Sequence, residues 1–326
     1  MGQVSLFLGT EFSWIHHADG HVTVSLTQQS FVETLIESLG IQSTHTAYFI
    51  TPFCSGNVID SIPREDMSST ARDELRLKYQ SLVGSLNWLA VTTRPDLATV
   101  VSLLAQHQSD PSSGHYKAAL HVVQYLANTK DLGIYFTSCR RSTLESFLHF
   151  PVPPTVLSMS NANWGPQDAS LSSSDQDLPL FVSRSMSVYY IDLLGPLHWM
   201  SKRQKVTAAS SAEAEIYAMD ECVKFLLELS QLLDFLGVRS LFMPPTNIIY
   251  NDNNAFVQWS KSMTSNGLRH IQMRENHIRE NIATKFICIN HIGGKINLAD
   301  VFTKEMKDTL HFVEIRDLFM CRRLPI

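Results

Sequence analysis

The sequence predicts an α/β protein of two domains. The first is mostly helical and opens with a β-hairpin, and in the second a mixed sheet is flanked by helices. The chain has 326 residues, 44% hydrophobic and 17% charged, which is a globular composition and enough for about two domains. Its second half alternates strand-like and helix-like runs in the order β-β-β-α-β-α-β-α. Within it, residues 211–236 keep apolar side chains on one helical face, which predicts a long amphipathic helix.

The first half begins with two strand-like runs joined by HHADG, where Asp19-Gly20 is a typical hairpin signal. A helix is expected to start after Thr27 and to stop at Gly40. Residues 43–70 are rich in Ser, Thr and Pro, which indicates a loop. Apolar spacing predicts three more helices, over about 70–90, 96–108 and 113–128.

A domain boundary is expected near residues 139–156, which carry three prolines near their end and no convincing periodicity. We therefore expect a first domain over 1–139, a linker over 140–155 and a second domain over 156–326. The second domain is expected to contain, besides the long helix, strands near 156–160, 180–192, 197–201, 246–251 and 285–292, and helices near 268–283 and from 298.

The bulk properties favour an intracellular, cytoplasmic protein. The five cysteines are scattered without a close pair, which favours a reducing compartment over a disulfide framework. No apolar run approaches the roughly 18–20 residues that a membrane-spanning helix needs, so no membrane partner is expected. The net charge of −5 argues against a generally basic coat for nucleic acid, although it allows a local basic surface.

Polar side chains stand at the ends of several elements of the second half. The strand-like run LSMSNAN ends with Asn161 and Asn163 on one face, Asp252 ends the strand NIIYND, Glu215 lies in the first turn of the long helix, and Asp300 opens the last helix. Carboxylates that converge in this way could hold two Mg²⁺ ions for phosphodiester hydrolysis. Each residue also has an ordinary alternative: Glu215 complements the helix dipole, Asp252 forms a turn, and Asp300 caps a helix.

Several long phrases resemble copia-type retrotransposon polyproteins. In the second half these are SKRQKVTAASSAEAEIYAMDECVK, IYNDNNAFV, HIQMRENHIRE and INLADVFTKEM, and in the first half FLGTEF, YQSLVGSLNWLAVTTRPDLATVVSLLAQ and HYKAALHVVQYLANTKDLGIYF. The resemblance implies a ribonuclease H-like mixed sheet with flanking helices over 156–326. It also implies a reverse transcriptase thumb or connection-like region, following the palm, over 1–139. No Asp-Asp pair occurs in the chain, so no polymerase active site is expected in it.

The resemblance also implies a catalytic and metal-binding set that acts with two Mg²⁺ or Mn²⁺ ions on the RNA strand of an RNA–DNA hybrid. Glu215 matches the helix glutamate, with Glu213 as the rival assignment, and Asp252 and Asp300 match two further acids. His291 resembles a mobile-loop histidine. The family strand phrase Ser-Asp-Ala-Asp/Asn-Trp-Gly places an aspartate where this chain has Asn161. An amide cannot bridge two ions as a carboxylate does, so we expect an impaired or inactive nuclease.

Basic residues give the candidate nucleic-acid contacts. Lys202, Arg203 and Lys205 precede the long helix, and His270 and Arg274 share one face of a later helix. A solvated turn and an ordinary helix surface are the alternatives. The implied partners are an RNA–DNA hybrid or other nucleic acid and upstream reverse transcriptase segments, in the cytoplasm, in virus-like particles or in the nucleus. The alternative function is a catalytically inactive nucleic-acid-binding or inert remnant of a decayed element.

Overall fold

Two compact units make up the chain. The computed structural model describes residues 2–41, 49–54, 59, 62–63, 65–164, 184–262 and 272–322. The first unit comprises Met1–Ser138 together with Glu305–Ile326, and the second comprises Cys139–Lys304. The sequence analysis places everything after residue 155 in one domain, whereas here the residues from 305 onward belong with the first half.

The first unit contains an antiparallel sheet in the order β1-β2-β3-β4-β10. The expected hairpin is present as β2 and β3, joined through Gly20, whose positive φ of 87° suits the turn. The sequence analysis did not anticipate β4 and β10. The strands span β1 (Leu6–Phe7), β2 (Thr10–His16), β3 (Val22–Thr27), β4 (Leu132–Thr137) and β10 (Met320–Arg322).

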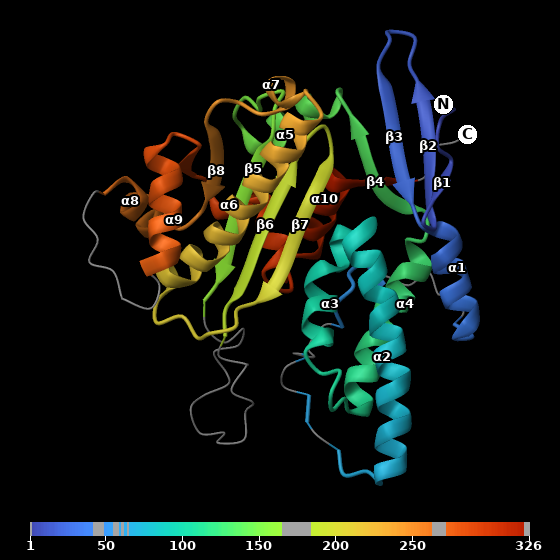
Figure 1. Cartoon of the computed structure of the whole chain (residues 1–326). Helices are drawn as coiled ribbons and strands as arrows, with labels where there is room; N and C mark the ends of the chain where they lie inside the picture. Colours follow the sequence, from blue (N-terminus) through green and yellow to red (C-terminus); the bar gives the residue numbers. More distant parts are fainter. Residues whose placement is uncertain are drawn as a thin grey trace. The chain divides into compact units, whose positions relative to one another are not determined.

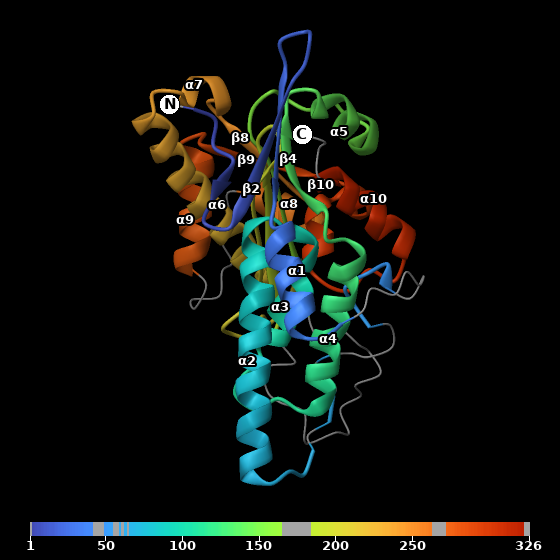
Figure 2. The ribbon, with the colours of Figure 1, turned by 90° about the vertical axis from the view of Figure 1, so that its right-hand side faces the viewer.

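The helices of the first unit follow the expected apolar pattern. They are α1 (Gln29–Ser38), α2 (Ser69–Thr92), the 3-10 turn η3 (Pro95–Leu97), α3 (Ala98–Ala105), α4 (Ser113–Asn128) and α10 (Thr309–Phe319). The Ser68 hydroxyl caps α2 by accepting from the backbone N–H of Ala71 at 3.3 Å. Figure 2 shows α2 packed beside α3 and α4. At the turn after α2, Arg94 donates to Asp96 at 2.7 Å in a buried ion pair, and Tyr125 of α4 also donates to Asp96.

The second unit contains a mixed sheet in the order β7-β6-β5-β8-β9. Strand β6 pairs antiparallel with β5 and with β7, whereas β8 runs parallel to β5 and to β9. The strands span β5 (Leu157–Asn163), β6 (Met186–Asp192), β7 (Pro196–Arg203), β8 (Asn247–Asn251) and β9 (Ile287–His291). This mixed sheet with its flanking helices has the ribonuclease H-like fold, which confirms the expected fold class.

The long helix α6 (Ser211–Phe235) crosses one face of this sheet (Figure 1). Its apolar stripe, including Met219, Val223 and Leu226, is buried against the sheet together with residues of α8 (Asn254–Lys261) and α9 (Gln272–Ala283). Neighbouring residues of β6 serve opposite faces, because side chains alternate along a strand. Tyr189 packs on Phe225 of α6, and Tyr190 packs on Phe302.

Some elements of the second unit differ from the expected ones. The segment expected to be a linker contains α5 (Arg140–Leu148), and the short helices α7 (Arg239–Phe242) and α8 were not anticipated. The expected last helix is divided: the 3-10 turns η4 (Gly294–Ile296) and η5 (Leu298–Phe302) lie in the second unit, and α10 lies in the first. Among the described helices, none is both long and apolar enough to cross a membrane.

Candidate active site

Strand β5 brings Asn161 to the centre of the acidic residues. The strand lies between β6 and β8, so Asn161 is only 5% exposed. Its side-chain nitrogen donates to Oδ2 of Asp252 at 3.4 Å and to Oδ1 of Asp300 at 3.3 Å. Three of the four positions expected from the sequence therefore meet, and the amide of Asn161 supplies the hydrogens that connect the two carboxylates.

Asp252 follows directly after β8. Because β8 runs parallel to β5, both strands deliver their last residues to the same edge of the sheet. Burial raises the pKa of the Asp252 carboxyl, and the nearby negative charge of Asp300 raises it further. The backbone approaches closely here, since a Cβ on Gly294 would lie 3.2 Å from Oδ2 of Asp252.

Asp300 lies in η5, which begins at Asn297. The Asn297 side chain caps this turn by accepting from the backbone N–H of Ala299 at 3.1 Å. Capping therefore belongs to Asn297, and the Asp300 carboxylate is directed to the cluster. The hydroxyl of Thr303 lies 3.0 Å from Oδ1 of Asp300 and serves as a further donor.

Glu215 and Glu213 have different roles on the first turns of α6. Oε2 of Glu213 accepts from the backbone N–H of Ala209 at 2.7 Å, just before the helix. Oε2 of Glu215 instead accepts from Nδ2 of Asn251, the residue before Asp252, at 2.8 Å. The structure thus brings Glu215, and not Glu213, toward the cluster. Burial raises the pKa of Glu215 to about 8, opposed by the Asn251 hydrogen bond.

Asn251 is a residue of this site that the sequence analysis missed. It is fully buried at the end of β8, and its nitrogen also lies 3.1 Å from the carbonyl and the hydroxyl of Ser160 on β5. Asn297 reaches the same carbonyl at 3.3 Å. The signal that could have revealed Asn251 is an amide at the end of the strand-like run NIIYN, and the signal for Asn297 is an asparagine directly before a helical turn, in INLAD.

His291 ends β9 and is exposed. Its backbone pairs beside Asn251 in the parallel register. The charges of Lys304 and His291 both lower the pKa of Asp252, against the stronger effect of burial. His291 therefore lies near Asp252, but at the end of a strand and not in a loop such as the resemblance implies. Lys304 is a second neighbouring cation that the sequence analysis did not single out.

The candidate nucleic-acid contacts are partly brought together. A pocket of about 520 Å³ in the second unit is lined by residues that include Lys202, Arg203, Lys205 and Arg274. His270 lies outside the described residues. The Arg274 guanidinium also forms an ion pair with the buried Asp220 of α6 and lies 4.7 Å from the centre of the Tyr217 ring. Arg274 therefore connects α9 to α6 as well as lining the pocket.

The residues present do not fit a pair of divalent ions. A dication needs oxygen atoms directed at it, whereas the Asn161 amide directs N–H groups toward the position between Asp252 and Asp300. Within the parts of the chain that the structure describes, no group of three or more His, Cys, Asp or Glu side chains is arranged to hold a metal ion. The donors at the Asn161 position therefore suit the two carboxylates better than they suit a cation.

The chain is similar to known polyproteins over most of its length. It is 30% identical over 233 residues to the Retrovirus-related Pol polyprotein from transposon RE2 of Arabidopsis thaliana, which covers 70% of this chain and 14% of that polyprotein. A shorter relative, Secreted RxLR effector protein 161 of Plasmopara viticola, is 33% identical over 147 residues, covering 45% of this chain and 87% of that protein. No family model matches the chain.

Among solved structures, one match is LC11-RNase H1 isolated from compost, at 14% sequence identity and a TM-score of 0.32. The match covers 46% of this chain and 94% of the LC11-RNase H1 chain. The chain spans about 14% of the length of the RE2 polyprotein. The match covers more than two thirds of this chain at 30% identity, which agrees with the resemblance of its sequence phrases to such polyproteins. The chain belongs to the retrovirus-related Pol polyproteins of copia-type transposons.

Proposed function

We propose that the second unit is a ribonuclease H-like domain in which hydrolysis of RNA–DNA hybrids by two metal ions is severely impaired or lost. One observation carries this proposal: the amide of Asn161 donates to both Asp252 and Asp300. The resemblance implies an aspartate at this position, whose two anionic oxygens would attract cations. The amide instead satisfies the neighbouring carboxylates itself.

Loss of one carboxylate has a large effect on a two-ion mechanism. An amide offers one neutral oxygen, so it neither offsets the charge of two dications nor bridges them. Displacing a reacting group by about 1 Å can lower a rate on the order of 10²-fold. Binding of Mg²⁺ or Mn²⁺ at this cluster should therefore be weak, and turnover should lie at least about 10²-fold below that of a carboxylate-bearing variant.

The test is cleavage of a labelled RNA–DNA hybrid by the full chain with Mg²⁺, with Mn²⁺ and with a chelator. We expect cleavage by Asn161→Asp with either metal and background cleavage by the wild-type chain. Asn163→Asp is the matched control, because it adds the same charge two residues along β5 and should stay at background. Wild-type turnover equal to that of Asn161→Asp would overturn the proposal.

A second function, binding of nucleic acid without cleavage, is favoured by the pocket that Lys202, Arg203, Lys205 and Arg274 line. Cationic side chains on one surface suit the phosphate backbone. We propose an RNA–DNA hybrid as its partner. From family membership, we also propose that the domain works inside the cell beside reverse transcriptase segments of a polyprotein.

Salt dependence of hybrid binding tests this second function. If Lys202 and Lys205 each contact a phosphate, the double variant Lys202→Gln/Lys205→Gln should lower the slope of log affinity against log salt by about 2. Lys78→Gln, at an exposed position on α2 of the first unit, is the control and should leave the slope unchanged. Equal slopes for the wild type and the double variant would exclude this surface as the binding site.

A further inference from the structure

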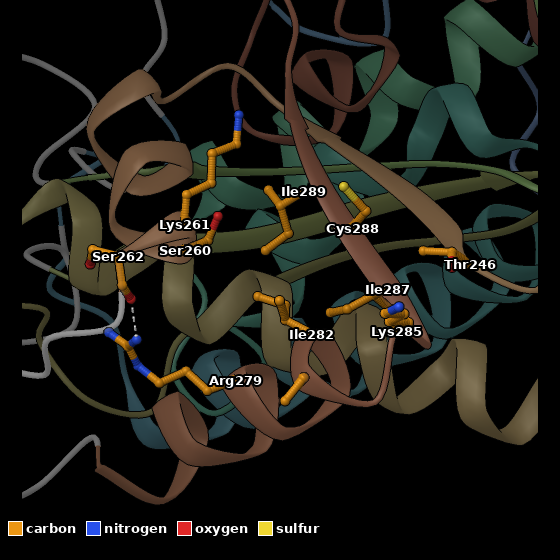
Figure 3. Close-up of a pocket in the computed structure, with 11 residues that line it drawn as sticks. Thr246, Ser260, Lys261, Ser262, Arg279, Ile282, Lys285, Ile287, Cys288 and Ile289 are labelled. Carbon is orange, nitrogen blue, oxygen red and sulfur yellow. Dashed lines mark hydrogen bonds between the residues drawn. The ribbon is translucent and has the colours of Figure 1, made fainter.

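A groove opens at the edge of the sheet in the second unit, away from the acidic cluster. It has a volume of about 670 Å³ and lies between the end of α8, the end of α9 and the edge strand β9 (Figure 3). Strand β9 is last in the sheet and, among the described strands, pairs only with β8. The groove therefore follows from an uncovered sheet edge with two helices above it.

The floor of the groove is apolar. Ile287 and Ile289 of β9 lie at its base but are only 1% and 2% exposed, because they pack in the core of the unit. The accessible apolar surface comes from Ile282 and Ala283 at the end of α9 and from Cys288 of β9. Figure 3 shows Ile282 of α9 beside Ile287 and Ile289 of β9. A volume of this size is typical of sites for small organic ligands, which bury an apolar body against such residues.

The rim of the groove is cationic. Lys261, Arg279 and Lys285 line it, whereas its described lining contains no Asp or Glu. Within the described residues, neither Lys261 nor Lys285 has an ion-pair partner. Arg279 is fixed in place, because it donates to the carbonyl of Ser262 at 2.7 Å and lies 4.5 Å from the centre of the Trp259 ring. In a chain whose net charge is −5, this local positive charge favours an anionic ligand.

Lys285 has a backbone conformation that is unusual for a lysine. Its φ is +58°, the left-handed region that favours glycine, and it follows the end of α9. The backbone there forms a Schellman motif, with Lys285 N donating to Ile282 O at 3.0 Å and Phe286 N to Asn281 O at 2.9 Å. The same motif ends α1 and α6, where Gly40 and Gly237 occupy the equivalent position. At the groove the chain instead carries a lysine, as it carries His149 at the end of α5, so this position keeps a cationic side chain at the rim where glycine would be less strained.

We propose that this groove binds a small amphipathic anion, with its apolar body against Ile282, Ala283 and Cys288 and its carboxylate at the lysine rim. The volume of the groove and its apolar lining favour a ligand with a small apolar body. The absence of acidic groups among the described lining residues, together with Lys261 and Lys285, selects its charge. The site is independent of the acidic cluster, so its occupancy does not depend on nuclease activity.

Calorimetric titration of the full chain with decanoate tests the proposal, with decanol and decyltrimethylammonium as neutral and cationic probes of the same length. We expect decanoate to bind roughly tenfold more tightly than decanol, which corresponds to one charged contact of about 1.4 kcal/mol. The cationic probe should not bind. Equal affinity for decanoate and decanol would overturn the proposal, because the groove would then be merely apolar.

Lys285→Gly provides the sharpest variant, because its effects on binding and stability have opposite signs. It should weaken decanoate binding roughly tenfold and, by relieving the strained φ, raise Tm by roughly 2–4 °C. Lys261→Gln should weaken binding without raising Tm. Lys295→Gln, an exposed lysine of η4 outside the groove lining, is the control and should change neither. A Lys285→Gly variant that binds decanoate as tightly as the wild type would contradict the proposal.

Discussion

Nδ2 of Asn251 lies 2.8 Å from Oε2 of Glu215, so a neutral amide satisfies the most buried acid of the candidate active site. The same nitrogen lies 3.1 Å from the carbonyl of Ser160. One buried side chain thus connects β8, β5 and α6. Amides from two strands, Asn161 and Asn251, donate hydrogen bonds to the acids of the cluster.

Removing this amide should destabilise the second unit. Asn251→Ala leaves Glu215 and Ser160 without their buried donor, which should lower the free energy of unfolding by about 2–3 kcal/mol. Urea denaturation measures the change. Asn290→Ala, a less buried amide on β9, is the control and should stay within about 0.5 kcal/mol of the wild type. Similar losses for both variants would show that Asn251 has no special role.

Two glycines of the first unit should respond to the same substitution with opposite signs. A Cβ on Gly133 would lie 2.1 Å from the carbonyl oxygen of Leu26, so Gly133→Ala must separate β4 from β3 and should cost about 3 kcal/mol. Gly84 lies within α2 and a Cβ there would meet no atom within 4 Å. Gly84→Ala should therefore stabilise the helix by about 1 kcal/mol. Thermal unfolding of both variants checks the pair, and two changes of the same sign would contradict it.

Arg274 should contribute to stability as well as to any nucleic-acid binding. Its guanidinium pairs with Asp220, which also accepts from Lys224 at 2.7 Å and from His277 at 2.8 Å. Because two partners remain and Arg274 is partly exposed, Arg274→Gln should cost only about 1 kcal/mol. Denaturation with and without a hybrid ligand separates the two effects. If stability is unchanged while hybrid affinity falls, Arg274 acts only on the ligand.

His198 should make the second unit less stable in mild acid. Its ring stacks 4.1 Å from Phe225, and burial lowers its pKa below the ordinary value of 6.5. The unfolded chain therefore takes up a proton at a higher pH than the folded chain. The stabilisation that neutral His198 contributes is fully present above about pH 6.5, and it is lost as the pH falls toward the pKa of His198 in the folded chain.

His198→Phe should flatten this part of the stability curve, because the proton is no longer taken up on unfolding. Free energies of unfolding between pH 5 and 8 provide the measurement. His17→Gln, at an exposed position of the first unit, should keep the wild-type slope. An unchanged slope for His198→Phe would show that another group controls the acid response.

The sequence predicts those parts of the fold that depend on local patterns. The hairpin at Asp19-Gly20 and the long helix α6 follow from turn chemistry and apolar spacing. The grouping of positions 161, 252 and 300 was expected mainly from the family resemblance, because each residue taken alone also has an ordinary structural role. Helix α5 does not, because its amphipathic pattern is weak and it is held by the buried ion pair of Arg140 with Asp192. Strand β10 has only three residues, and its partner β4 lies far away in the sequence.

The hydrogen bonds of the site could likewise not be predicted from the sequence. An asparagine in place of an aspartate indicates a lost charge, but it does not say whether its amide hydrogens find acceptors. That depends on Asp252 and Asp300 lying within 3.4 Å of its nitrogen, which only the assembled sheet and η5 provide. The choice between Glu213 and Glu215 was open for the same reason.

The pairing of β10 with β4 sets an order for folding during synthesis. A ribosome delivers the whole of the second unit before residues 305–322, which complete the sheet of the first unit. The second unit can therefore close its core while the first still has an open sheet edge at β4. A chain released early, after residue 304, would keep that edge exposed, and such edges promote aggregation. Chain termination near residue 304 should thus damage the N-terminal unit more than the ribonuclease H-like one.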